Sequence, residues 1–521
     1  MKNSKDMFTT IAASAILALS LCGCGKKAVV FPAPEGVAKS EHYDICADGQ
    51  NVFAYATYRM DWNSKEKIAN SPVAPLAFCI FDFEKDANVE LKLPKGIIKN
   101  PSDAVVRPLA LGIKPAVDLS NPNFDRVSLS LPRPNNYTFD PRGDGTCALH
   151  IFTNAPEKSR PDKNDPNVIY LGAGVHKIDK MKLDSNKTLY LEGGAVLLCS
   201  PKEKKGIYKV NGIELNNMKD PITLVDAENV TICGRGIISC AGSLQRGERM
   251  TPFRIRGVKN LTLRDIAIIE ASEWNVSLYG AKDVLIDGLR ILSYYVNSDG
   301  ICPTSNCDNI LVKNCFIHNA DDAYELKAMD SYWGRKPKSE EKYFGDVRNV
   351  IFENCQVWND LAITMGVTHE IDHNIENVAF KNITVLHHTS IAGPYPVRGH
   401  IAIFPAGGGK VSNMLFENIV LENDSSKYKH CIVINNTHGD SWRKNTPRYD
   451  NRPHSIVENI TFRNIDFKNT KADKVGLFNH GKSDEIKNIR FENVLINGKK
   501  LTEKNIENRG AKFEISDSPQ N

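Results

Sequence analysis

The sequence predicts an all-β protein in which a right-handed parallel β-helix follows a smaller antiparallel β-sandwich. Two observations carry this prediction: a short phrase recurs through the second half, and the first part has a different, proline-bearing pattern. The 521 residues are too many for one ordinary core and suit two or three domains. We assign residues 1–27 to a signal and tether, 28–160 to the sandwich and 161–515 to the β-helix.

The recurring motif alternates apolar and polar residues and then has Asn, Asp or Gly. A second short run of residues that favour β-strands follows it. Its nine copies, from residue 229 onward, are NVTICG, NLTLRDI, DVLIDGL, NILVKNC, NVIFENC, NVAFKNI, NMLFENI, NITFRNI and NIRFENV. The apolar spacing of two residues predicts strands and excludes helical repeats, and the Asn, Asp or Gly predicts a tight turn.

The spacing of the copies indicates how these units assemble. A strand–turn–strand unit of 23 or more residues cannot bury its apolar face alone, so the units must stack as a solenoid. We expect the repeated asparagines to form a ladder from coil to coil. The unequal steps place loops at the corners, and we expect the loop at 328–346 to wall one end of a cleft.

The first part of the chain has another pattern. RVSLSLPRPNNYTFDP and CALHIFTN are alternating strands joined by turn residues, which predicts a separate antiparallel sandwich. Residues 155–166 are polar and proline-bearing, as expected of a linker. The strand pattern and paired glycines of 167–200 indicate the first coils of the β-helix.

The N-terminus has a lysine-bearing start, an apolar stretch from Ile11 to Leu21 and then small residues, which is typical of a secretory signal. The apolar stretch is short for a membrane span. The letters LCGC resemble a bacterial lipobox with Cys24 as the lipid-bearing residue. Cys22 fits less well, because Leu21 would then occupy the small-residue position. A plain cleaved signal is the alternative.

Acyl chains on Cys24 would anchor an otherwise soluble protein to the bacterial cell envelope, with no other membrane contact. Gly25 is not the acidic residue that would favour the inner membrane, so we expect the outer membrane. The net charge of +4, without a long Lys/Arg run, gives no case for a nucleic-acid partner.

Of the thirteen cysteines, two lie in the signal, and the remaining eleven show no CxxC and no zinc spacing. Cys315 and Cys355 occupy equivalent places in the repeat, where we expect small buried hydrophobes, with a disulfide bridge as the alternative. The sequence indicates no metal ion and no cofactor.

Two adjacent carboxylates, Asp321 and Asp322, stand in the stretch NADDAYELK, and Asp299 precedes Asp322 by 23 residues, one coil length. We therefore expect the three on one face of the solenoid, with NADDA forming a corner so that both neighbours reach a cleft. Clustered carboxylates raise one another's pKa. An acid with a raised pKa beside an ionised base is what glycosidic-bond hydrolysis needs, with inversion when the two are roughly 6.5–9.5 Å apart.

The stretches NSDGI, ADDAYELK and VWNDLAITMG resemble motifs of the polygalacturonase-like glycoside hydrolases of families 28 and 49, which share the pectin-lyase-like β-helix. The resemblance implies that Asp321 is the general acid and that Asp299 and Asp322 hold and deprotonate the attacking water. It also implies that Asn297 and Lys327 line the site.

Two departures from polygalacturonases bear on the substrate. Their G-H-G histidine is missing from NDLAITMG, and RGHIAIF stands where they carry R-I-K, which grips a carboxylate. A uronate calls for a fork of cationic donors. We therefore expect a neutral glycan, such as dextran, another α-glucan or a galactan-like chain.

Further residues are expected to contact the carbohydrate substrate. Trp274 and Trp358 would stack on sugar faces, with packing as the equal alternative, and Asp360 falls at the same part of the repeat. His369 and Glu370 would reach the rim of the cleft. Polygalacturonase or lyase action on a uronate-containing glycan, and a non-catalytic glycan-binding lipoprotein, stay open as alternatives.

Overall fold

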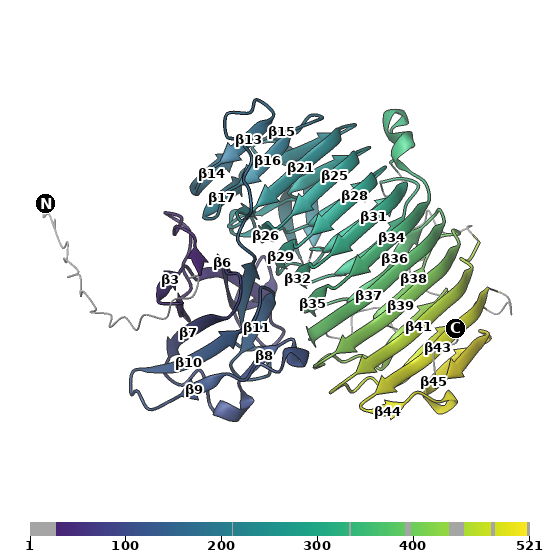
Figure 1. Ribbon diagram of the computed structural model, residues 1–521. Helices are drawn as coiled ribbons and strands as arrows, with labels where there is room; N and C mark the ends of the chain where they lie inside the picture. Colours follow the sequence, from purple (N-terminus) through teal and green to yellow (C-terminus); the bar gives the residue numbers. More distant parts are fainter. Residues whose placement is uncertain are drawn as a thin grey trace, which may run out of the picture.

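The computed structural model describes residues 28–210, 212–332, 335–390, 398–436, 453–480 and 485–517. The predicted signal and Cys24 lie outside the described residues. Figure 1 shows a solenoid, teal to yellow, with a smaller β domain, purple to blue, packed against its side. The predicted fold class is confirmed: a β-sandwich precedes a parallel β-helix.

The sandwich consists of two sheets in the described part of the chain. One sheet holds β1 (Val29–Val30), β4 (Tyr55–Met60), β5 (Lys67–Ile68), β6 (Ser71–Asp82), β8 (Val105–Arg107), β11 (Asn136–Asp140) and β12 (Leu149–Asn154). The other holds β2 (Asp44–Ala47), β3 (Gln50–Val52), β7 (Ala87–Pro94), β9 (Ala116–Asp118) and β10 (Phe124–Leu131). Pairing is antiparallel except between β6 and β12, which run parallel. Burial along β7 alternates residue by residue, as the sequence pattern requires.

The β-helix is built from two long parallel sheets. The larger holds β13 (Val168–Leu171), β14 (Gly174–Ile178), β16 (Thr188–Leu191), β17 (Ala195–Cys199), β21 (Glu228–Gly234), β22 (Ile237–Ser239), β25 (Lys259–Arg264), β26 (Ala267–Ile269), β28 (Lys282–Asp287), β29 (Arg290–Ser293), β31 (Cys307–Lys313), β32 (Phe316–Asn319), β34 (Val347–Glu353), β35 (Gln356–Asn359), β37 (Ile375–His388), β39 (Val411–Leu421), β41 (Val457–Phe467), β43 (Ile486–Ile496), β44 (Lys499–Lys500) and β46 (Phe513–Ser516). Within it only the terminal β43–β44 hairpin is antiparallel in the described chain.

The second sheet faces the cleft. It holds β15 (Met181–Lys182), β20 (Ile222–Val225), β24 (Phe253–Arg256), β27 (Val276–Tyr279), β30 (Ile301–Ser305), β33 (Tyr324–Ala328), β36 (Met365–Ile371), β38 (Gly399–Pro405), β40 (His430–Asn435), β42 (Lys474–Phe478) and β45 (Ile506–Arg509). A side sheet adds β18 (Lys204–Val210), β19 (Ile213–Met218) and β23 (Glu248–Arg249). The 3-10 helices are η1 (Pro101–Asp103), η2 (Leu109–Leu111), η3 (Leu244–Arg246), η4 (Lys338–Tyr343) and η6 (Glu503–Asn505).

The predicted asparagine ladder is present. The Asn260 amide donates to Asn229 Oδ1 at 2.8 Å, and the same contact repeats further along, as from Asn459 to Asn413 at 3.0 Å. All four residues have left-handed φ angles between 54° and 59°, a conformation that asparagine tolerates. Each ladder asparagine thus turns the backbone and forms a side-chain hydrogen bond to the asparagine of the neighbouring coil.

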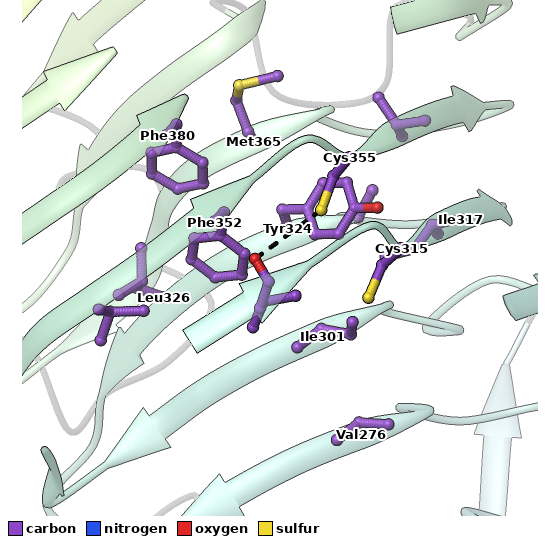
Figure 2. Packing of buried hydrophobic residues seen from close by; sticks show 14 of the residues in the cluster. Val276, Ile301, Cys315, Ile317, Tyr324, Leu326, Phe352, Cys355, Met365 and Phe380 are labelled. Carbon is purple, nitrogen blue, oxygen red and sulfur yellow. Dashed lines mark hydrogen bonds between the residues drawn. The ribbon is translucent and has the colours of Figure 1, made fainter. Parts of the chain in front are cut away.

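Apolar side chains of successive coils stack inside the solenoid. Phe352 and Phe380 stack with ring centroids 4.7 Å apart and an angle of 4° between planes, and Figure 2 shows them beside Tyr324 in the interior. Cys315 and Cys355 are buried in the same core as free thiols, so the prediction of small hydrophobes is confirmed. This packing fixes coils at a constant spacing, which makes positions along the repeat meaningful in space.

The sandwich docks on the side of the β-helix through apolar and charged contacts. Phe78 and Phe152 of the sandwich pack in one cluster with Phe316 and Trp358 of the coils. Arg235 forms an ion pair with Asp82 at 2.9 Å with both side chains buried. A buried ion pair that bridges two domains fixes their mutual orientation, because separating its partners would leave a buried charge unpaired.

Candidate active site

A cleft of about 1440 Å³ runs along the second parallel sheet and is closed on one side by the sandwich. Eight of the ten residues predicted for catalysis or binding line it: Trp274, Asn297, Asp299, Asp321, Asp322, Lys327, His369 and Glu370. The predicted wall is also present, because Tyr332, Arg335, Pro337 and Glu340 of the 328–346 loop line the same cleft.

The three predicted aspartates come together as the coil arithmetic requires. The Gly300 amide donates to the carbonyl of Asp322 at 2.9 Å, so the segments are adjacent coils. Asp321 and Asp322 lie in the bend between β32 and β33. Carboxylate oxygens of Asp299, Asp322 and Glu325 lie within 4.8 Å of one another. The corner thus aims both neighbours into the cleft.

Asp321 differs from the other two in its surroundings. Its Oδ2 accepts the Asn297 amide at 2.8 Å and its Oδ1 accepts the Asp322 amide at 3.0 Å. Asp299 and Asp322 are buried, whereas Asp321 is half-buried. Burial raises the pKa of Asp321, and the amide of Asn297 and the charge of Arg398 act against it.

Asp299 and Asp322 have pKa values well above that of an ordinary carboxyl. Burial is the main cause for both, and the charges of Glu325 and Asp321 add to it. Burial also acts on Glu325, but the ammonium of Lys327 and hydrogen bonds outweigh it, so the pKa of Glu325 is lowered. The site therefore combines carboxyls of raised pKa, Asp299 and Asp322, with Glu325, whose pKa is lowered.

Lys327 balances the charge of this cluster. Its Nζ lies 3.0 Å from Glu325 and 3.2 Å from Glu370, and it donates to Thr368 Oγ1 at 2.9 Å. The ammonium also lies 5.2 Å from the centroid of the Trp274 ring. Asp299, Asp322 and Glu325 are close enough to ligate a cation, but Lys327 already supplies a positive charge at that point.

Two predicted substrate contacts are wrong, those of Trp358 and Asp360. Trp358 is fully buried and stacks on His318 with a centroid distance of 5.1 Å. Asp360 is buried as well and accepts His318 Nε2 at 2.9 Å. Both lie on the side that the sandwich covers, where His150 contacts His318 at 2.9 Å. The docked domain takes the place that a sugar would need.

Several lining residues were missed in the sequence. Trp62 belongs to the sandwich, lines the cleft and donates its Nε1 proton to the carbonyl of Asp360 at 2.8 Å. Arg249 lies 3.2 Å from Glu273 and its guanidinium sits 3.6 Å from the centroid of Tyr208. Nothing in the local sequence marks Trp62, because its domain reaches the cleft only through docking.

Arg398 is a cation that the sequence interpretation did not assign. It is the first residue of RGHIAIF, the stretch that stands where polygalacturonases carry R-I-K, and it lines the cleft. Burial acts to lower the pKa of Arg398, but Tyr428 and the charges of Asp322 and Asp321 outweigh it and raise that pKa. RGHIAIF lies in the coil that follows NDLAITMG, and this position in the repeat was the sequence signal that could have identified Arg398.

The fold and the site together define a class of proteins: parallel β-helices that carry a cluster of carboxyl groups in a cleft along one of their sheets. The chain belongs to Glycosyl hydrolases family 28, whose sequence profile matches residues 164–513. It is 23% identical over 247 residues to "Probable exopolygalacturonase X" of Neosartorya fischeri, which covers 43% of this chain and 49% of that protein. The chain thus spans about half the length of this curated relative.

The fold is also similar to solved structures. Dex49A from Penicillium minioluteum superposes with a TM-score of 0.60 at 14% sequence identity, covering 95% of this chain and 99% of that one. The similarity therefore includes both the sandwich and the β-helix. No helix in the described parts of the chain is long and apolar enough to cross a membrane.

Proposed function

We propose that this protein is an inverting glycoside hydrolase that cleaves O-glycosidic bonds in the cleft. One observation carries the proposal: a half-buried carboxyl, Asp321, stands beside the buried carboxyls of Asp299 and Asp322, all with raised pKa values. Hydrolysis with inversion needs one carboxyl that gives a proton and another that takes one from water.

The geometry supports a division of roles. Asp321 is the general acid, because it is the most accessible of the three and its raised pKa favours the protonated form that delivers a proton to the leaving oxygen. Asp299 and Asp322 lie deeper and hold the attacking water between them. One of the two acts as the base in its ionised form, and Lys327 and Arg398 favour that form of Asp322. Lys327 and Arg398 offset the charge that builds up when these carboxyls ionise.

The substrate proposed is a neutral glycan. Much of the cationic lining is already neutralised by cleft carboxylates, as in Arg254 with Glu340 at 2.7 Å and Lys327 with Glu370 at 3.2 Å. Paired cations offer little net attraction to an anionic chain, whereas sugar hydroxyls can join such networks as donors and acceptors. Trp274 and Trp62 add apolar faces to the cleft.

A uronate-containing glycan is the second candidate, supported by Arg398 beside Asp321 and Asp322. A guanidinium near the acid–base pair could receive the carboxylate of a uronic acid. The similarity to a protein named as a probable exopolygalacturonase points the same way.

A panel of glycans read by NMR tests both candidates. Incubation with dextran, other α-glucans, galactans and polygalacturonate would give the product and its first-formed anomer together. We expect release from a neutral glycan, with the configuration at the new reducing end opposite to that of the bond cleaved. Retention of configuration would contradict the inverting mechanism, and release from polygalacturonate alone would select the second candidate.

The same panel separates two other activities. A lyase would give an unsaturated product with ultraviolet absorbance, which the hydrolase mechanism does not produce. A non-catalytic binding protein would bind a glycan without releasing product, and Asp321→Asn would then change affinity only.

We also propose that Cys24 carries lipid and anchors the protein in a bacterial cell envelope, on the outer membrane. The lipobox-like LCGC supports this. Labelling with a radioactive fatty acid in a bacterial host should mark the wild-type protein and Cys22→Ser but not Cys24→Ser. Label on Cys24→Ser would contradict the assignment.

A further inference from the structure

Behind the cleft, three buried side chains form a chain of polar contacts that ends at a catalytic carboxyl. His400 Nε2 lies 3.2 Å from Asp424 Oδ2, and His400 Nδ1 lies 3.0 Å from His388 Nδ1. His388 Nε2 lies 2.8 Å from the carbonyl oxygen of Ala362. The three side chains have no solvent exposure.

The chain continues through one peptide group. The carbonyl of Ala362 belongs to the same peptide as the amide of Ile363, which donates to Asp322 Oδ1 at 3.1 Å. Tyr428 donates its hydroxyl proton to the same carbonyl at 3.1 Å. Donors on a carbonyl polarise the peptide and strengthen donation from its N–H. The two histidines therefore act on the Asp322 carboxylate through the Ala362–Ile363 peptide and make no direct contact with it.

The histidine pair and Asp424 form one buried polar cluster. Because the Ala362 carbonyl needs the proton of His388 Nε2, His388 Nδ1 accepts from His400 Nδ1. Burial lowers the pKa of His400, and the charge of Asp424 acts against that effect. Burial raises the pKa of Asp424, but the two histidines outweigh it and hold that pKa below the ordinary value.

We propose that Asp424, His400 and His388 are positioning residues that fix and polarise the Ala362–Ile363 peptide and so hold Asp322 as a base. This inference rests on the proposed hydrolase function. The same three groups could be grouped as metal ligands, and Asp424 Oδ1 also lies 3.7 Å from His388 Nδ1. His388, however, uses Nδ1 for His400 and Nε2 for the Ala362 carbonyl, so both of its ring nitrogens are already engaged.

Other groups also act on Asp322, and the test must separate them from the path that runs from Asp424 through His400, His388 and the Ala362–Ile363 peptide, here called the relay. Asp299 and Glu325 lie within 4.8 Å of it. Asp321 raises the pKa of Asp322, whereas Lys327 and Arg398 lower it. The relay acts from the far side, through the backbone amide. Its loss should raise the pKa of Asp322 further, because the carboxylate loses part of a hydrogen bond.

Two variants at His388 distinguish the relay from bulk packing. In His388→Gln the side-chain amide can replace the Nε2–H donor toward Ala362, whereas in His388→Asn it is too short. We expect His388→Asn to lower kcat on the order of tenfold with little change in KM, and to move the acidic limb of the kcat/KM profile to higher pH. His388→Gln should recover part of both.

His430 offers a matched control. It is a buried histidine on β40 that lies 3.1 Å from Glu507 and makes no contact with Ala362. His430→Asn should leave the acidic limb in place whatever it does to stability. An acidic limb unmoved in His388→Asn, or moved equally in His430→Asn, would overturn the proposal.

A readout without turnover keeps this test separate from the proposed function. The wild type should show low-field imidazole proton resonances that both His388→Asn and His400→Asn remove together. Their independent loss would overturn the relay, as would a stoichiometric transition-metal ion found in the purified protein. If no glycan is cleaved, the hydrolase proposal fails while these resonances still report on the relay.

Discussion

The backbone amide of Asn297 donates to Oδ2 of Asp321 at 2.8 Å across adjacent coils. Asn297 has a left-handed φ of 66°, which turns its amide toward the cleft. Its side-chain oxygen accepts the hydroxyl of Tyr208 at 2.9 Å. A tight turn on one coil, braced by the side sheet, thus orients the proposed acid on the next.

Asp321→Asn keeps the shape of the side chain but cannot deliver a proton. We expect kcat to fall by roughly 10²–10⁴-fold with KM little changed, measured on the glycan that the wild type cleaves. An aryl glycoside whose phenolate leaves without a proton should recover much of the rate. Asp308→Asn, a substitution in the ladder at the surface, is the control. Full activity of Asp321→Asn would remove Asp321 from the acid role.

Asp299→Asn should abolish turnover and yet stabilise the fold at neutral pH. Because the pKa of Asp299 is raised in the folded state, mainly by burial, folding favours its protonated form. Its contribution to stability is therefore complete below the unfolded pKa and is lost as pH rises through the folded one. A neutral asparagine avoids that loss.

Thermal unfolding at two pH values checks this expectation. The melting temperature of Asp299→Asn should exceed that of the wild type at neutral pH, and the difference should shrink in acid. A lower melting temperature at neutral pH would mean that the ionised Asp299 is stabilised by its neighbours, contrary to the direction of its pKa.

Trp62 allows the contribution of the sandwich to the cleft to be measured. Trp62→Ala should raise KM roughly fivefold, about 1 kcal/mol, with a smaller effect on kcat, because a stacking face is lost away from the reacting bond. Trp62→Phe keeps a ring but loses the hydrogen bond to Asp360, so an intermediate KM is expected. Identical KM values in all three proteins would exclude contact with substrate.

Trp358 tests the corrected assignment. Because the ring is fully buried between the two domains, Trp358→Ala should cost about 3–5 kcal/mol of unfolding free energy, visible as a lower melting temperature. KM of the folded protein should stay near that of the wild type. Trp358→Phe should lose less stability. A raised KM with an unchanged melting temperature would place the ring back in the substrate site.

Much of the site followed from the periodic sequence. The repeat fixes the length of a coil, so a separation of 23 residues predicts that Asp299 and Asp322 are neighbours. The corner NADDA predicts that Asp321 reaches the same cleft. Both expectations depend on local chain geometry, in which the alternation of strands and the left-handed turns of asparagine leave few other conformations.

The position of a residue along a coil does not reveal what covers it. Asn359 pairs with Asn319, so Asp360 is level with Ala320, one residue before Asp321. Asp321 lines the cleft, whereas Asp360 lies on the side that the sandwich covers. The docking of a domain remote in the chain buries Trp358 and brings Trp62 to the cleft. Such contacts depend on the matching of two whole surfaces, and this matching leaves no periodic trace in the sequence.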